Sequence, residues 1–325
     1  MADLDLTTAA PAARASRAGR PLRVWASDAF EVPLPPGHPF PMEKYRALRE
    51  RLLAEGVVAA DEVTLSEPAP VAWLERAHDP AYVARAIAGD LAAGEVRRLG
   101  LPWSPALVAR ARAAVGGTVQ AAFAALVHGV AGNLAGGTHH AFRDRGEGYC
   151  LFNDHAVAIA ALRAAGHAAR PFIVDLDVHQ GNGTAALFAA DPTVFTLSMH
   201  ARTNYPLHKE RSSLDVELED GTDDETFLAR LDRHLGPALD GHAPDLVLYQ
   251  AGVDAHEHDR LGRLGLTFAG LAARDERVFA ACETRGLPVV VTLGGGYGRP
   301  LESTVIAHAQ VFRAARAARD RRPPA

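Results

Sequence analysis

Three polar residues with a regular spacing are the first candidates for chemistry. Asp175, Asp177 and His179 follow one another at intervals of two residues. Alternate side chains of an extended segment point to the same side, so all three would share one face. Two carboxylates on one face need a positive charge nearby, and a divalent metal ion bound by Asp, His and a third carboxylate would supply it, while the remaining carboxylate orients a histidine. A helix cap with a surface ion pair is the alternative interpretation.

Other candidate residues lie in short polar segments. His139 and His140 follow Gly136-Gly137, and loop glycines let the backbone pass close to a ligand, although adjacent histidines alone often have no function. Asp254 lies between an apolar segment and a polar loop. It is a candidate for the same site, with a solvated loop carboxylate as the alternative interpretation.

Three further features are weaker signals. The run Gly294–Gly296 is followed by neither a G-x-G-x-x-G nor a Walker pattern, so a turn that presents Tyr297 is at least as good an interpretation as a phosphate site. Cys150 would need a base and an electropositive setting to act as a nucleophile, and we expect a small buried residue instead. The segment 256–258 (His-Glu-His) resembles a metal-binding pair, but alternate loop positions usually face apart, so a solvated loop is favoured.

Short apolar runs alternate with segments of helical periodicity along the chain. Most of these runs are continuously apolar, which is typical of parallel strands covered on both faces. We predict strands at Leu22–Trp25, Pro171–Asp175, Val194–Ser198, Asp245–Gln250 and Leu287–Leu293, with Gly129–Ala135 as a further candidate. Apolar residues at spacings of three and four predict helices over 42–55, 79–91, 104–128, 154–165, 223–240, 268–285 and 300–317. Ser104-Pro105 and Asp223-Asp224 are N-terminal signals for two of them.

This alternation predicts an α/β fold, a doubly wound and mostly parallel sheet with helices on both faces. No internal repeat, heptad run or linker interrupts residues 21–318, which we expect to form a single domain. Residues 1–20 are predicted to be a disordered lead-in, and residues 319–325 a basic C-terminal tail. In open α/β sheets ligands bind outside the carboxyl ends of the strands, where the polar segments described above would converge.

Composition excludes several classes of protein. The 325 residues carry 39 acidic and 34 basic side chains, a net charge of −5, which argues against a dedicated nucleic-acid binder. No apolar stretch approaches the roughly 18–20 residues of a membrane span, and the acidic start Met1–Asp5 is unlike a signal peptide. Two cysteines form no disulfide framework, so we expect a reducing cytoplasm. The Arg-rich segment from Arg313 onward is predicted to be a solvated helix end rather than an interaction tail.

Five motifs occur in the order found in a known enzyme family. They are Gly136-Gly137-Thr138-His139-His140-Ala141, Gly148–Asp154, Asp175–Gly183, Gly252-Val253-Asp254 and Gly294–Tyr297. From about residue 22 to residue 317 the chain resembles the zinc-dependent histone deacetylase and acetylpolyamine amidohydrolase superfamily. Residues His38–Pro41, Leu101–Ser104 and Gln180–Asn182 are most similar to the class IV branch and its bacterial relatives. The resemblance implies an arginase/deacetylase-like variant of the α/β fold.

The resemblance also implies one metal ion per chain. Asp177, His179 and Asp254 would bind Zn²⁺, with Fe²⁺ as the alternative native metal. The ion would activate a water and polarise the amide carbonyl of the substrate. This ligand set matches the residue types that the spacing of two had suggested.

Proton transfers are assigned by the same resemblance. One or both of His139 and His140 would take the proton of the attacking water, and His140 would deliver one to the leaving amine. Asp175 would orient His139, and Asn182 would contact His140, where many relatives carry an Asp. Tyr297 would donate its hydroxyl to the developing oxyanion.

A narrow acyl-lysine channel is a further implication. Gly148, Tyr149, Tyr205 and Leu261 occupy the positions that would line it, and the two tyrosine hydroxyls are expected to influence substrate choice. The family's structural monovalent cation, K⁺, would bind the backbone near Asp175, Asp177, His179 and Ser198.

Two residues depart from the family pattern. His258 stands before Asp259 where relatives usually have Gly, which predicts a narrowed entrance or a reshaped pocket floor. Thr138 replaces a bulkier apolar residue, which predicts more room near the metal. Both leave the exact substrate class open.

We therefore expect a zinc-dependent amidohydrolase that removes an acyl group from an amine, first of all from an N6-acyl-lysine of a protein or peptide. An acetylated polyamine or another small acylamine is the alternative substrate, which predicts acidic residues at the pocket mouth. A ureohydrolase-like enzyme would need two metal ions, and an acyl-lysine binding protein would have lost turnover; both are less favoured. We expect no nucleic-acid partner and no membrane span, and a homo-oligomer is left open.

Overall fold

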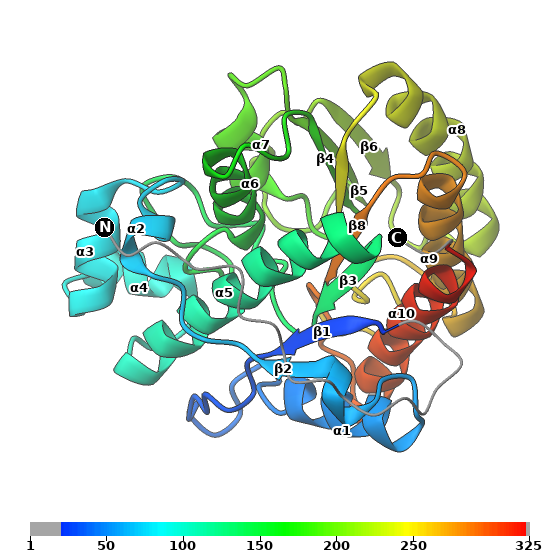
Figure 1. The fold of residues 1–325 in the computed structure, drawn as a ribbon. Coiled ribbons are helices and arrows are strands. Elements are labelled where there is room, and N and C mark those ends of the chain that lie inside the picture. Colours follow the sequence, from blue (N-terminus) through cyan, green and yellow to red (C-terminus); the bar gives the residue numbers. More distant parts are fainter. Residues whose placement is uncertain (1–20, 323–325) are drawn as a thin grey trace.

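An eight-stranded sheet organises the computed structural model, which describes residues 21–322 (Figure 1). The strands are β1 (Arg23–Ala26), β2 (Val63–Leu65), β3 (Val130–Asn133), β4 (Pro171–Asp175), β5 (Phe195–Ala201), β6 (Leu214–Leu218), β7 (Leu246–Gln250) and β8 (Val289–Thr292). They lie in the order β2-β1-β3-β8-β7-β4-β5-β6, and every neighbouring pair is parallel. The predicted α/β fold with a mostly parallel sheet is confirmed, and the pairing of these strands is parallel throughout.

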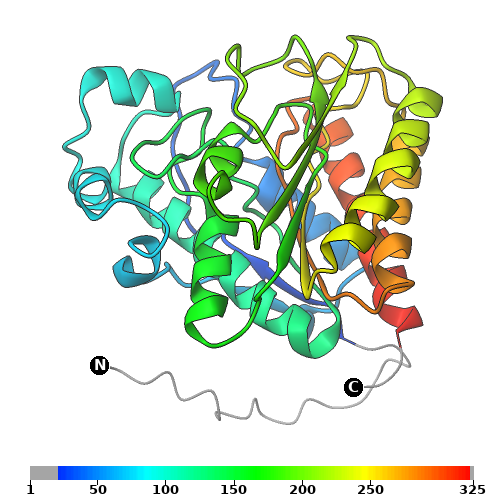
Figure 2. The same ribbon diagram turned by 90° about the horizontal axis from the view of Figure 1, so that it is seen from above.

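Helices cover both faces of the sheet, as predicted (Figure 2). They are α1 (Lys44–Ala54), α2 (Val71–Leu74), α3 (Pro80–Ala88), α4 (Ala93–Leu99), α5 (Pro105–His128), α6 (Asp154–Ala164), α7 (Asn182–Phe188), α8 (Asp224–His242), α9 (Phe268–Glu283) and α10 (Leu301–Arg321), with a short 3₁₀ helix at Ala60–Glu62. Helices α1, α8, α9 and α10 share one core with the sheet, and α2 to α6 share the other. Among the residues described, no helix is both long and apolar enough to cross a membrane.

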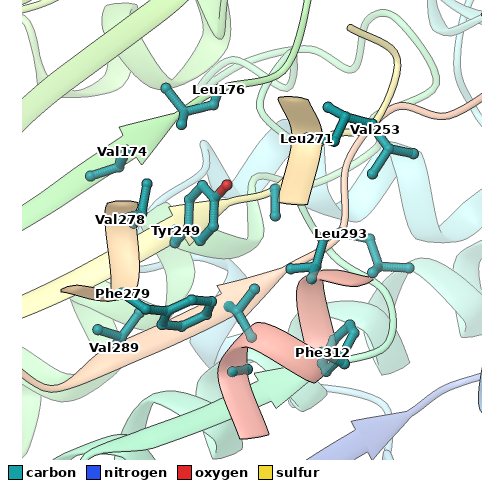
Figure 3. Close-up of a cluster of buried hydrophobic side chains, with 14 of the residues drawn as sticks. Val174, Leu176, Tyr249, Val253, Leu271, Val278, Phe279, Val289, Leu293 and Phe312 are labelled. Carbon is teal, nitrogen blue, oxygen red and sulfur yellow. The ribbon is translucent and has the colours of Figure 1, made fainter. Parts of the chain in front are cut away.

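Both cores draw on the same strands, because successive side chains of a strand point to opposite faces. Val174 and Tyr249 face the core under α9 and α10, where the ring centroid of Tyr249 lies 6.0 Å from that of Phe279 (Figure 3). Ile173 and Leu248, one position before each, join the opposite core with α5 and α6. A strand that is buried on both faces must be apolar at every position, which explains the continuous apolar runs in the sequence.

Side-chain caps begin the helices that flank the carboxyl edge of the sheet. Leu107 N donates to Ser104 Oγ at 3.0 Å at the start of α5, and Thr226 N donates to Asp223 Oδ1 at 2.9 Å before α8. Both N-terminal signals seen in the sequence are therefore confirmed. Asn153 is a third cap, since its Oδ1 accepts from Ala156 N at 3.0 Å at the start of α6.

Two edge strands and three short helices were not predicted. Strand β2 has only three residues, with Leu65 exposed, so its apolar pattern is too short to recognise. Strand β6 reads Leu-Asp-Val-Glu-Leu, the alternating pattern of an edge strand with one solvated face. Helices α2, α4 and α7 have four or seven residues, and such lengths show too little periodicity for a prediction.

The C-terminal helix is packed more closely than predicted. The helix expected over 300–317 continues as α10 to Arg321, past the predicted domain boundary. Arg313 and Arg316 form ion pairs with Glu55 and Glu62. The prediction of a solvated helix end from Arg313 onward is therefore wrong as far as Arg319, which is buried, whereas Asp320 and Arg321 are exposed as predicted. The predicted lead-in 1–20 and the end of the predicted tail, 323–325, lie outside the described residues.

The carboxyl ends of four successive strands in the sheet, β3, β8, β7 and β4, carry the polar segments. Strand β4 ends at Asp175, β7 at Gln250 and β8 at Thr292. Since parallel strands end at the same edge of a sheet, the segments that follow them begin side by side. The convergence predicted from the sequence is therefore present in the fold.

Candidate active site

A buried group of one imidazole and two carboxylates lies at this edge. His179 Nδ1 is 3.0 Å from Asp177 Oδ1 and 3.0 Å from Asp254 Oδ2. The three potential ligand atoms lie within 4.8 Å of one another, and all three residues are buried. Within residues 21–322 this is the one group of three or more His, Cys, Asp or Glu side chains that could hold a metal ion. It is the ligand set that the sequence predicts.

The electrostatics of this group fit a bound cation. Burial and the neighbouring Asp177 raise the pKa of Asp254 to about 7. Burial lowers the pKa of His179, but Asp254 and Asp177 outweigh it and raise that pKa to about 10. Both shifts arise because two buried carboxylates compete for one positive charge. A divalent ion supplies that charge, and two carboxylates with one imidazole leave a coordination position open.

Backbone groups hold both carboxylates in place. Gly295 N donates to Asp177 Oδ2 at 2.6 Å, and Val178 N donates to Asp254 Oδ1 at 2.9 Å. A Cβ at Gly295 would overlap the Asp254 carboxylate, so no other residue fits there. The run Gly294–Gly296 thus lets the backbone approach the metal site, which accounts for it without a phosphate ligand.

Each histidine of the pair has a different partner. His139 Nδ1 donates to Asp175 Oδ2 at 2.7 Å, whereas His140 Nδ1 lies 2.7 Å from Asn182 Oδ1. Burial lowers the pKa of His139, but Asp175 outweighs it and the net shift is upward. Burial and the adjacent His139 hold the pKa of His140 well below its ordinary value. Both predicted contacts are present. The contact with Asp175 favours the charged form of His139, whereas burial and the adjacent His139 favour the neutral form of His140.

Tyr297 lies beside the metal group with its hydroxyl protonated. Its side chain is buried, and burial together with Asp254 and Asp177 raises its pKa well above the ordinary value. Asp259 Oδ2 accepts from the backbone N–H of Tyr297 at 2.6 Å, and Arg260 Nε donates to its carbonyl at 2.8 Å. The backbone of Tyr297 is thus fixed, and its hydroxyl is available as a hydrogen-bond donor.

Lys44 supports the loop that carries Tyr297, and the sequence analysis missed it. The residue is only 1% exposed. Its Nζ donates to Gly294 O at 3.0 Å and lies 5.3 Å from the centroid of the Tyr297 ring, with Phe40 and Tyr45 at similar distances. The rarity of lysine is a signal that could have pointed to this residue, since Lys44 is one of only two lysines among the 34 Lys and Arg residues.

A cavity of about 540 Å³ leads from the surface to this site. Its lining includes all four predicted channel residues, Gly148, Tyr149, Tyr205 and Leu261. Gly148 leaves room for the His140 ring, because a Cβ at this position would overlap it. A small inner cavity adjoins the first and is lined by His139, His140, Asp177, His179 and Tyr297. The remaining predicted residues, Asp175, Asn182 and Asp254, lie behind these groups as hydrogen-bond partners.

Some predictions made for neighbouring residues were wrong. His258 was expected to narrow the entrance or reshape the floor, but its side chain is 70% exposed and lines neither cavity. His256 was expected in a solvated loop, yet it is buried with its ring centroid 4.2 Å from that of Phe268. Cys150 is buried as expected, and burial raises the pKa of its thiol, which opposes a nucleophilic role.

Two further predictions concern residues beside the metal group. Thr138 lines the inner cavity, and its hydroxyl donates to Phe152 O at 2.6 Å. Asp175 and Ser198 are neighbours in the β4–β5 ladder, so the segments named for the K⁺ site lie together. The extra room at Thr138 and the K⁺ site stay predictions.

Three arginines at the mouth of the channel were also not foreseen. Arg98, Arg260 and Arg263 line the outer cavity, whose lining contains no Asp or Glu. Arg263 Nη1 lies 3.5 Å from Asp220 Oδ2. In the part of the chain that the structure describes, neither Arg98 nor Arg260 has a carboxylate within 4.0 Å. The mouth therefore presents positive charge to an incoming substrate.

Comparison with known proteins assigns the chain to a family. Residues 38–312 match the family model described as histone deacetylase domain. The chain belongs to the histone deacetylase family. An uncharacterized protein of Picosynechococcus sp. is 47% identical over 287 residues, which cover 88% of this family member and 96% of that protein. Histone deacetylase 2 of Arabidopsis thaliana is 38% identical over 189 residues, 57% of this chain and 49% of that protein, so the chain spans about half the length of that relative.

The fold of this histone deacetylase family member is also shared by solved structures. The crystal structure of an HDAC homologue complexed with SAHA has a TM-score of 0.78 at 24% identity, and the match covers 92% of this chain and 84% of that one. The arginase/deacetylase-like fold predicted from the motifs is thereby confirmed. As a member of this family, the chain is a hydrolase that acts on amide bonds, and its buried Asp-His-Asp group could bind the metal on which the family depends.

Proposed function

We propose that this histone deacetylase family member is a zinc-dependent deacylase of N6-acyl-lysine side chains. The observation that carries the proposal is the juxtaposition at the floor of one channel of the Asp-His-Asp group, the histidine pair and Tyr297. The proposal also includes three expectations that come from the sequence: zinc as the metal, a class IV-like affiliation and a cytoplasmic location.

The chemistry follows from the protonation states of the side chains. Asp177, His179 and Asp254 would hold Zn²⁺, which would supply Lewis-acid polarisation of the amide carbonyl and of a bound water. His140 is neutral and faces the channel, so it accepts the proton of the attacking water and returns it to the leaving amine. His139 contributes positive charge, and the protonated Tyr297 hydroxyl donates to the developing oxyanion.

The walls of the channel suit the side chain of an acylated lysine. Tyr149, Tyr205 and Leu261 present rings and an apolar branch to the cavity. A lysine stem consists of four methylene groups, which gain free energy when such walls remove them from water. Acylation removes the charge of the lysine amine, so the buried end of the substrate is neutral.

The charge at the mouth favours a peptide over a polyamine. An acetylated polyamine keeps further ammonium groups, which is why a small-amine substrate predicts acidic residues there. Arg98, Arg260 and Arg263 line the mouth instead, without a lining carboxylate. Like charges across this entrance oppose a polycation, whereas a neutral or acidic peptide meets no such repulsion.

Neither a ureohydrolase-like enzyme nor an acyl-lysine binder without turnover fits the side chains of the described residues. A ureohydrolase-like enzyme needs a two-metal cluster, but residues 21–322 contain one candidate group. A binder without turnover would lack part of the catalytic set, whereas His139, His140 and Tyr297 are all in place. About one zinc ion per chain is therefore expected in the loaded protein.

Acyl release by the purified, zinc-loaded protein tests the proposal. The panel contains matched lysine peptides with acetyl to long fatty acyl groups and acetylated polyamines, with His140→Ala as the blank. We expect release from peptides at a higher kcat/KM than from polyamines and loss of this release in the blank. Release from polyamines alone would support a small-amine amidohydrolase instead. No release from any substrate by protein with one zinc bound would refute the proposal.

A further inference from the structure

Asn182, the partner of His140, is itself held by a carboxylate with no assigned role. Its Nδ2 donates to Glu147 Oε1 at 3.0 Å, while its Oδ1 faces His140 Nδ1 at 2.7 Å. Glu147 Oε1 also accepts from Tyr205 OH at 2.6 Å. The Glu147 side chain is 14% exposed, and Arg145 Nε lies 3.6 Å from its second oxygen. A continuous hydrogen-bonded chain therefore runs from His140 through Asn182 and Glu147 to the channel wall.

The turn that carries Glu147 holds its carboxylate firmly. Glu147 and Cys150 exchange backbone hydrogen bonds of 3.0 and 2.9 Å. Gly148 and Tyr149, between them, have φ of +54° and +67°. A positive φ at a bulky residue such as Tyr149 is rare and persists only where the surroundings enforce it. The carboxylate is thus presented to Asn182 from a defined backbone.

The carboxylate decides the direction of every hydrogen bond in the chain. An ionised Glu only accepts, so the NH₂ of Asn182 must point to Glu147 and its oxygen to His140. The amide oxygen only accepts as well, so His140 Nδ1, 2.7 Å away, must carry a proton, which leaves Nε2 as the nitrogen that can accept one. Without Glu147 the amide could turn over and present NH₂ to Nδ1, which selects the other tautomer.

We propose that Glu147 is a positioning residue that fixes the tautomer of His140 through Asn182, so that Nε2 stays ready to accept a proton. Glu147 lines neither cavity, and its side chain reaches the site through Asn182 and Tyr205. The inference rests on the proposed function in one respect, the assignment of His140 as the general base.

Nitrogen-15 NMR of the zinc-loaded protein measures the tautomer directly. With the His140 signals assigned by their loss in H140A, we expect Nδ1 protonated and Nε2 unprotonated in the native protein. E147A is expected to show a mixture of tautomers. E147Q keeps an amide oxygen that accepts from both neighbours and is expected to match the native protein. D144N is the matched control, because it removes an exposed carboxylate from the same loop whose ion pair is with Arg145.

The same variants are expected to differ in kcat. E147A lowers kcat about tenfold or more at a nearly unchanged KM, whereas E147Q and D144N stay within about threefold of the native enzyme. Y205F leaves the Asn182–Glu147 bond intact and is expected to change KM rather than kcat. This split distinguishes positioning of the base from a contribution to the channel wall.

Exchanging the carboxylate and the amide between positions 147 and 182 provides the sharpest test. N182D sets two carboxylates against each other across the 3.0 Å contact, so kcat is expected to fall further than in E147A. In N182D/E147Q the glutamine NH₂ donates to the introduced carboxylate, so the double variant is expected to regain about tenfold or more over N182D. A merely structural role for Glu147 would produce no such recovery.

Two results would overturn the inference: a native tautomer and kcat in E147A, or a double variant no more active than N182D. Circular dichroism and thermal melting identify variants that misfold, and should E147A misfold, the comparison of N182D with N182D/E147Q decides the test. Should the native enzyme hydrolyse no acylated amine, the proposed function fails, but the NMR comparison still decides whether Glu147 sets the tautomer.

Discussion

His78 joins both ends of the loop that carries Glu147 and Tyr149, and it makes stability depend on pH. Its ring is fully buried, with Nδ1 donating to Phe142 O at 2.8 Å and Nε2 accepting from Asn153 N at 2.9 Å. Protonation of Nε2 would set two N–H groups against each other. Burial lowers the pKa of His78 to about 4.

The size of the effect follows from this shift. Between pH 6.5 and pH 4 the unfolded chain binds a proton at His78 that the folded protein does not, so the free energy of unfolding decreases as the pH falls through that window. The full shift corresponds to about 3 kcal/mol, of which about 2 kcal/mol is lost between pH 7 and pH 5. This is a substantial part of the stability of a typical protein.

Urea unfolding of zinc-loaded native protein and H78Q at pH 7 and pH 5 measures this loss. Glutamine keeps one donor and one acceptor but does not titrate, so the native protein should lose about 2 kcal/mol more than the variant. Buried His200, whose pKa burial also lowers to about 4, contributes equally to both proteins and cancels. A difference below about 0.5 kcal/mol between the two pH dependences would refute the reasoning.

Three further predictions concern the site. Y297F removes the oxyanion donor and should lower kcat about 10²- to 10³-fold at unchanged zinc content, so a fully active variant would exclude this role. D254N removes one of three ligands and should leave the protein largely free of zinc after dialysis, as measured by metal analysis, whereas native retention would remove Asp254 from the ligand set. R98E should raise the kcat/KM of an acetylated polyamine about threefold or more relative to a neutral acetyl-lysine peptide. An unchanged ratio in R98E would show that the mouth does not select by charge.

Local sequence was sufficient wherever the surroundings of a residue follow from its own segment. The strand at Pro171–Asp175 was predicted with the observed bounds because both of its faces are buried. Asp177 and His179 follow it at a spacing that brings them together in any extended segment. The caps at Ser104 and Asp223 are likewise contacts within three residues.

Prediction failed where the deciding contact comes from a distant segment. Strand β2 forms a strand only because β1 pairs with it, since three residues have no pattern of their own. His256 reads as a loop residue, yet Phe268 covers its ring. Lys44 reads as an ordinary residue of a surface helix, although its ammonium group is enclosed by the loop of Tyr297.

The sequence by itself determined the fold class, the order of the motifs and the types of side chain that follow each strand, because apolar runs and short spacings are local properties. Only the tertiary structure decided how those side chains act. Asn182 meets Glu147 across 35 positions, and Lys44 meets Gly294 across 250. The neutral state of His140 and the positive charge of the channel mouth arise in the same way. Burial, pKa and hydrogen-bond direction depend on atoms that converge from several strands, and the linear order of residues does not contain those distances.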